Sequence, residues 1–169
     1  MNVGDGIRNE PSSFYLSIGR LLLGFSSLFG AIDKMFGIRM TTPELAFING
    51  GSPCKGFLIG VSNGPLGFLF DPLVDISRFV DAIIILSLFL MGVALLLGIG
   101  RKLCCILGAV LMFLFYLASL PIVEIPFVDF HLIYVAFLLA LYHSKAFSIL
   151  GFGNQWKETA LVKRYPILE

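Results

Sequence analysis

The sequence predicts an all-α integral membrane protein: a four-helix bundle with short interfacial or re-entrant segments between helices 1 and 2. Of its 169 residues, 57% are hydrophobic and only 14% are charged, whereas soluble domains are about one quarter charged. Four apolar stretches also approach the roughly 20 residues that an α-helix needs to cross a bilayer. The length suits one unit, so we expect a single transmembrane domain over residues 1–169.

The first expected span, residues 14–37, reads FYLSIGRLLLGFSSLFGAIDKMFG. No separate cleavable signal precedes it, so we expect it to stay as an anchor. A charge near the centre of such a helix costs about 2.5–3.5 kcal/mol. Steps of three and four place five charged or small residues on one helix face, which we expect to look into protein or a wet cavity. These residues are Arg20, Gly24, Ser27, Ala31 and Lys34.

The connection over residues 38–78 contains the turn signals NGGSPCKG and SNGPLG. Its apolar pieces, GFLIGVS and LGFLFDPLVDISRF, are too short to span, so we expect them to be re-entrant or to lie at the interface. The other three spans are expected at about 79–98, 103–120 and 130–150.

The distribution of Lys and Arg predicts the orientation. With four spans, both termini and the loop GIGRK share one side, whereas the connection PIVEIPFVDF has no Lys or Arg. The positive-inside rule then puts both termini in the cytoplasm of a multi-pass protein of the cell membrane. The basic residues of that side are Arg8, Arg101, Lys102, Lys157, Lys163 and Arg164, with Lys145 nearby.

Cysteine, histidine and charge exclude several classes. Cys104 and Cys105 are adjacent, and the expected topology puts Cys54 across the membrane from them, which argues against a dithiol relay. No zinc-type spacing is present, and His131 and His143 are twelve residues apart on one helix and share no face. We therefore expect no metal or haem. A net charge of +1 without a basic tract also argues against nucleic acid.

Polar residues of all four expected helices fall at one membrane level, toward the outside. In helical bundles, sites form where such side chains face inward. Another interpretation stays open: helix ends simply meet water, with Lys34 and Arg78 snorkelling and Asp81 and Asp129 capping helix starts. Arg20, in a smaller inner group with Tyr142, His143 and Lys145, can snorkel too. The outer group is Asp33, Lys34, Arg78, Asp81, Tyr116, Ser119, Asp129 and His131, with Glu124 just before it.

A quinone suits a pocket of this kind. Its ring and tail come from the bilayer, its two carbonyls need hydrogen-bond donors, and its reduction needs protons. We take Lys34, His131 and Asp129 as catalytic candidates. The candidates for binding the quinone are Arg20, Lys34, Tyr116 and Asp81.

The chain resembles the DoxX-like family of four-helix membrane proteins, and within it the DoxD-type small subunits of thiosulfate:quinone oxidoreductases. The likeness covers nearly the whole chain. In the family an acidic residue directly precedes the histidine of the fourth helix, whereas Phe130 separates the two here. The likeness rests on Gly19-Arg20-Leu21, Gly30, Asp33-Lys34, the stretches NGPLGFLFDPL and GVALLLGIGRK, the helix start from Asp129 to Tyr134, and Lys163-Arg164-Tyr165-Pro166.

The resemblance implies a membrane subunit of a redox complex that passes electrons to quinone, with a partner subunit supplying any thiosulfate chemistry. The alternative is a non-catalytic scaffold or accessory subunit, because no flavin, haem or metal motif is present and small-residue helix faces suit partners. A transporter is less supported, since no inverted repeat is visible. We expect membrane lipid and partner subunits around the chain, and a homo-oligomer stays open.

Overall fold

The computed structural model describes residues 10–121 and 127–169, so the predictions for Arg8 and Glu124 lie outside the described residues. Within those ranges all regular structure is helical, which confirms the all-α prediction. The elements are α2 (Glu10–Phe36), η1 (Phe47–Asn49), α3 (Lys55–Ser62), α4 (Gly67–Asp75), α5 (Ser77–Leu97), α6 (Arg101–Ala118), α7 (Phe130–His143), α8 (Gly153–Lys157), α9 (Ala160–Arg164) and η2 (Pro166–Leu168).

Three helices are long and apolar enough to cross a membrane: Pro11–Phe36 within α2, Ser77–Leu97 and Arg101–Ala118. They overlap the first three expected spans almost completely. Their length and composition indicate a membrane protein.

The expectation of a fourth helix over residues 130–150 is wrong at its second end. α7 ends at His143, and Ser144 is already extended with φ −96° and ψ 170°. Fourteen residues rise only about 21 Å, less than the roughly 30 Å of a hydrocarbon core. The helix stops at two polar residues, Ser144 and Lys145, where the Ser144 hydroxyl bonds locally to the backbone, and the carbonyls of Ala146 and Leu150 accept hydrogen bonds from Arg20 of α2.

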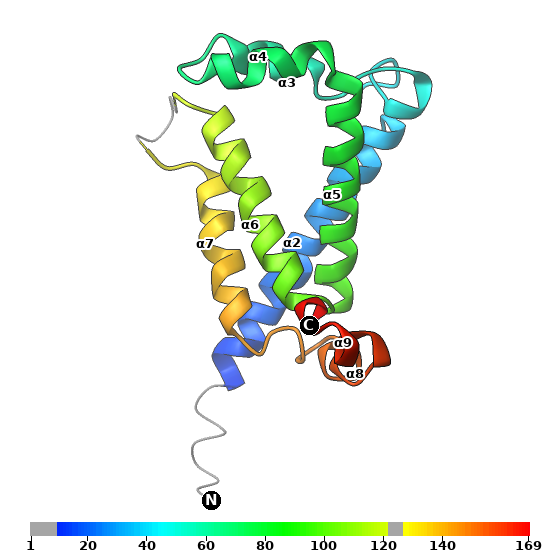
Figure 1. Cartoon of the computed structure of the whole chain (residues 1–169), viewed down its shortest axis with the longest axis vertical. Coiled ribbons are helices and arrows are strands. Elements are labelled where there is room, and N and C mark those ends of the chain that lie inside the picture. Colours follow the sequence, from blue (N-terminus) through cyan, green and yellow to red (C-terminus); the bar gives the residue numbers. More distant parts are fainter. Residues whose placement is uncertain (1–9, 122–126) are drawn as a thin grey trace, which may run out of the picture.

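The long helices pack as two pairs, α2 with α5 and α6 with α7 (Figure 1). The α2–α5 crossing is close because glycines face it. A Cβ on Gly92 would lie 2.6 Å from the backbone nitrogen of Leu28, and one on Gly24 would lie 2.9 Å from Cβ of Leu95. The small-residue face of α2 is therefore an internal packing surface.

Burial along α2 confirms the predicted stripe. Arg20 is 0% exposed, Ser27 and Ala31 are also buried, and Lys34 at the far end is half-buried. A helix face with this pattern looks into protein, as the spacing predicts.

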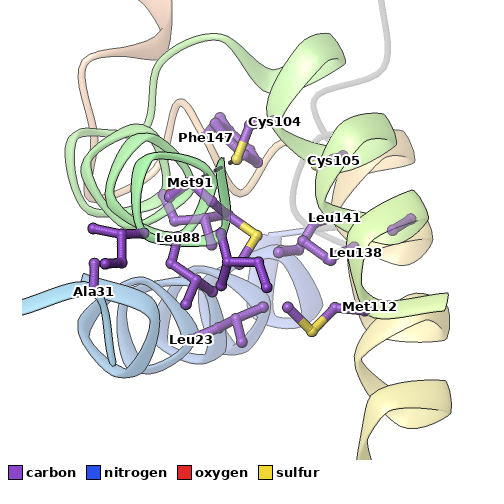
Figure 2. Packing of buried hydrophobic residues seen from close by; sticks show 14 of the residues in the cluster. Leu23, Ala31, Leu88, Met91, Cys104, Cys105, Met112, Leu138, Leu141 and Phe147 are labelled. Atoms are coloured by element: carbon purple, nitrogen blue, oxygen red, sulfur yellow. Dashed lines mark hydrogen bonds between the residues drawn. The ribbon is translucent and has the colours of Figure 1, made fainter. Parts of the chain in front are cut away.

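The two pairs approach one another at the end of the molecule that carries the chain's C-terminal tail and separate toward the opposite end, where α3 and α4 bridge them (Figure 1). We call these the tail end and the α3–α4 end. Side chains from all four long helices and from Phe147 form one apolar core (Figure 2). Its members include Leu23, Ala31, Leu88, Met91, Cys104, Cys105, Met112, Leu138 and Leu141.

At the tail end, α5 and α6 are joined by a tight turn with Gly98 and Gly100 at φ +70° and +60°, a conformation that favours glycine. The tail folds beneath this turn (Figure 1). Trp156 Nε1 donates a hydrogen bond of 2.6 Å to the carbonyl oxygen of Leu168. The carboxylate of Glu169 lies 2.9–3.1 Å from nitrogens of three basic residues, Arg101, Lys102 and Lys157.

Candidate functional site

Arg20 is a clasp between three segments of the chain. Its Nε donates to the carbonyl oxygen of Ala146 at 3.1 Å and its Nη2 to that of Leu150 at 2.8 Å. Its Nη1 donates to the carbonyl oxygen of Leu95, in the last turn of α5. The guanidinium also lies over the ring of Phe147, 5.4 Å from its centroid. Each of its three nitrogens thus has a partner in the chain's own backbone.

The surroundings explain how a buried guanidinium is tolerated. No carboxylate of the described residues pairs with Arg20, but the carbonyls at the end of α5 carry the negative end of that helix's dipole. Two glycines make space for the guanidinium because they have no side chain. A Cβ on Gly98 would lie 3.2 Å from Nη1, and one on Gly151 would lie 3.1 Å from Nη2. Non-helical backbone at membrane depth requires such internal partners.

Two buried carboxylates at the α3–α4 end, like Arg20, have their polar atoms hydrogen-bonded within the chain. Asp33, 1% exposed, accepts hydrogen bonds from the backbone nitrogens of Arg39, Met40 and Thr41 at 2.6–3.0 Å, which fixes the turn after α2. The second, Asp81 of α5, is described next.

Asp81 is 0% exposed and ties the long connection to α5. It accepts from Ser52 Oγ at 2.5 Å and from the backbone nitrogen of Cys54 at 2.8 Å. It lies inside α5 and does not cap the helix start, contrary to the open alternative. Its two carboxylate oxygens hold the loop that leads into α3.

Cys54 is a buried thiol in this loop, 5% exposed. Its pKa is raised to about 12, mainly by burial and also by the hydrogen bond with Asp81, while the Lys34 ammonium acts in the opposite direction. Cys54, in the loop before α3, is therefore held close to Lys34 of α2 and Asp81 of α5. Sequence reasoning placed Lys34 and Asp81 at this level but gave no role to Ser52 or Cys54, since a polar loop carries no spacing signal for a long-range contact.

His131 and Asp129 form a different kind of group, on the α6–α7 pair. Asp129 is the N-cap of α7 and accepts from the backbone nitrogen of Leu132 at 3.0 Å, as the capping alternative predicts. Its second oxygen lies 2.6 Å from His131 Nδ1, with both side chains 10–15% exposed. His131 Nε2 has no hydrogen-bond partner within the described ranges.

Aromatic rings surround this dyad. The His131 ring lies 5.5 Å from the Phe115 ring and 4.0 Å from the Phe130 ring, between centroids. Tyr116, one residue from Phe115, donates its hydroxyl to the carbonyl oxygen of Phe127 at 3.1 Å. The arrangement is a carboxylate-held imidazole with one nitrogen open, set among apolar surfaces.

The predicted outer level is thus divided into two clusters. The ends of α2 and α5, which carry Asp33, Lys34 and Asp81, lie apart from those of α6 and α7, which carry Asp129 and His131, and α3 and α4 bridge the two pairs across these ends (Figure 1). Phe57 of α3 packs edge-on against Phe115, with ring centroids 6.4 Å apart. Arg20 belongs to neither cluster, because its contacts are at the tail end.

An apolar pocket that sequence reasoning missed lies between α5 and α6 near the tail end. It has a volume of about 390 Å³, and none of the six candidate residues lines it. Among the described residues, no cluster of three or more His, Cys, Asp or Glu side chains can hold a metal ion. Comparison with protein-family models, with curated proteins and with solved structures finds no match.

Proposed function

We propose that the protein is a membrane subunit of a redox complex in which His131 and Asp129 protonate a quinone that receives electrons from a partner subunit. One observation carries the proposal: a largely buried imidazole whose Nδ1 is held 2.6 Å from a carboxylate while Nε2 has no partner among the described residues. A histidine held in this way by a carboxylate suits general acid–base chemistry.

The chemistry balances as follows. Reduction of a quinone to a quinol takes two electrons, which the partner subunit supplies, and two protons, one for each carbonyl oxygen. His131 donates its Nε2 proton to one oxygen, and Asp129 stabilises the imidazolium before that transfer. The second oxygen takes its proton from solvent water at the same membrane surface, and His131 is reprotonated from the same source. The rings of Phe115 and Phe130 give a flat apolar surface for the quinone ring.

The proposed membrane arrangement has four crossings. α7 supplies most of the fourth, and the irregular segment after it, whose carbonyls Arg20 satisfies, completes it. In this arrangement the tail end lies in the cytoplasm and the dyad near the outer leaflet, which the basic residues of the tail end support. A DoxX-like, DoxD-type subunit in the cell membrane fits this arrangement, and this family assignment is part of the proposal.

The test uses the complex as it exists in native membranes, purified through a tag on this chain. Reduction of a short-chain quinone is measured with thiosulfate as the electron donor and, separately, with a chemical reductant that loads the partner subunit. His131→Gln is expected to lower turnover by about 100- to 10,000-fold, the usual range for loss of a general acid. Asp129→Asn keeps an oxygen for the helix cap and is expected to lower turnover less.

The matched control is His143→Gln, which changes the exposed histidine at the other end of α7 and is expected to leave turnover unchanged. Unchanged turnover in His131→Gln would remove the dyad from the mechanism. A loss in Lys34→Ala with His131→Gln unaffected would move the site to the α2–α5 cluster.

A scaffold without catalysis is the second candidate. The observation that favours it is that Arg20, Asp33 and Asp81 are all occupied by the chain's own groups. Two results together support the scaffold. The complex with the unaltered chain shows no quinone reduction, and the complex with His131→Gln assembles normally.

A further inference from the structure

The pocket between α5 and α6 has the character of a chain-binding groove. Its volume of about 390 Å³ lies within the roughly 300–1,000 Å³ of small-molecule sites. The lining is almost wholly apolar and includes Leu90, Met91, Leu103 and Leu107. Both helices that form it are long and apolar enough to cross a membrane, which favours a lipid chain as the occupant of the groove.

A second, polar pocket of about 90 Å³ adjoins the groove at the tail end. The two share Gly100 and Trp156 as lining residues. An apolar groove that continues into a small polar pocket matches a molecule with an apolar chain and a polar head.

The polar pocket has an excess of positive charge. Three cations, Arg101, Lys145 and Lys157, line it with a single carboxylate, Glu169. Glu169 pairs with Arg101 and Lys157, whereas the Lys145 ammonium has no partner among the described residues. Among the buried side-chain nitrogens and oxygens of the described residues, Arg101 Nε is the one without a hydrogen-bond partner. A buried donor without an acceptor is rare in folded proteins.

We propose that the groove and its polar pocket bind one anionic phospholipid, with an acyl chain between α5 and α6 and the phosphate among Arg101, Lys145 and Lys157. The phosphate oxygens supply the acceptor that the Lys145 ammonium lacks and lie beside the cations of Arg101 and Lys157. A quinone head is neutral and does not use this charge excess. The site is separate from the His131–Asp129 dyad, and the inference does not depend on the proposed redox function.

The experiment is native mass spectrometry of the purified full chain, with any partners it retains, after incubation with equimolar phosphatidylglycerol and phosphatidylcholine of identical acyl chains. The unaltered protein is expected to retain phosphatidylglycerol preferentially. Lys145→Gln is expected to lower that preference about fivefold, the effect of one cation near an anionic headgroup. Lys163→Gln, at an exposed lysine outside both pockets, is the matched control and is expected to keep the preference.

The groove is tested with a pair of substitutions on one face of α6. Leu107→Trp fills the groove from its exposed side and is expected to lower retention of both lipids. Leu114→Trp, seven residues further on the same face, lies outside the groove and is expected to leave retention unchanged.

Three results would overturn the proposal. Equal retention of both lipids by the unaltered chain removes the headgroup assignment, and an equal effect of Lys163→Gln reduces it to general surface charge. Displacement of phosphatidylglycerol by a long-chain quinone, but not by phosphatidylcholine, reassigns the groove to the quinone's tail.

Discussion

The α2–α5 pair and the α6–α7 pair both carry polar side chains in an apolar setting, yet they use them differently. On α2–α5, Arg20, Asp33 and Asp81 are buried, and backbone groups or Ser52 occupy their polar atoms. On α6–α7, His131 is held by Asp129 through one nitrogen while the other has no partner among the described residues. The polar side chains of both pairs are largely buried, and the difference is that His131 Nε2 is left without a hydrogen-bond partner in the described part of the chain.

This difference separates structural from functional candidates. A buried ionisable group whose hydrogen bonds are all made within the chain stabilises the fold, and its removal leaves orphaned partners. A group with one open position can still bind an incoming molecule. The comparison therefore predicts that α2–α5 substitutions change stability, whereas the dyad substitutions change activity.

Arg20→Ala is expected to have the largest effect. It orphans the carbonyl oxygens of Leu95, Ala146 and Leu150, and each orphaned group costs about 1–3 kcal/mol, so unfolding in detergent should become easier by at least about 3 kcal/mol. Arg20→Lys keeps the charge but loses the planar guanidinium, so its stability should lie between those of the unaltered chain and Arg20→Ala. Titration with a denaturing detergent measures the change. Normal stability of Arg20→Ala would break the comparison.

Asp81→Asn is expected to destabilise the loop at Cys54 by about 1–3 kcal/mol. In the unaltered chain Cys54 is buried with its pKa raised to about 12, so maleimide at pH 8 should modify it slowly. Asp81→Asn should speed that modification, followed site by site by mass spectrometry. Asp71→Asn, at an exposed position of α4, is the control. Equal labelling rates in both variants would contradict the conclusion that Asp81 holds the loop at Cys54.

Glu169 extends the comparison to a surface group. Hydrogen bonds from Lys157 and Lys102 lower its pKa from 4.5 to about 2. Its contribution to tail packing is therefore fully present above pH 4.5 and is lost as the pH falls toward 2. Fluorescence of Trp156, the only tryptophan, should report the loss. Glu169→Gln should remove this pH dependence at modest cost, since the pairs are partly exposed; a transition that persists in this variant would assign it to another group.

His131→Gln is expected to have the smallest effect on stability, about 1 kcal/mol or less, because its side chain makes one hydrogen bond, to the N-cap of its own helix, and Gln keeps most of its contact with the Phe115 ring. The same detergent titration checks it. A loss as large as that of Arg20→Ala would place the dyad among the structural groups and weaken the redox proposal.

Sequence alone predicted much of the fold. Spacing identified the buried face of α2 from Arg20 to Ala31, and hydropathy located the three long spans. The early end of α7 was not predictable, because residues 144–150 remain largely apolar and their backbone partner, Arg20, is more than 120 residues away. Local patterns contain no information on such a contact.

The sequence predicted which residues belong to the polar level, but it did not predict which of them lie close to one another. Depth in the membrane put Lys34, Asp81 and His131 at one level, and it could not show that the two pairs separate at this end and are bridged by α3 and α4. The apolar pocket beside Trp156 was also missed, since helix faces with ordinary leucines give no sign of a gap between them. Grouping depends on helix separation, which is set by packing far from the polar residues.

The hydrogen bonds of Arg20 can be completed only late in the synthesis of the chain. The guanidinium enters with the first helix, but two of its acceptors, at Ala146 and Leu150, are made only after most of the chain has left the ribosome. Until then the newborn chain holds a cation with incomplete partners near lipid. The fold of the first helix is therefore complete only once the segment after α7 has been made.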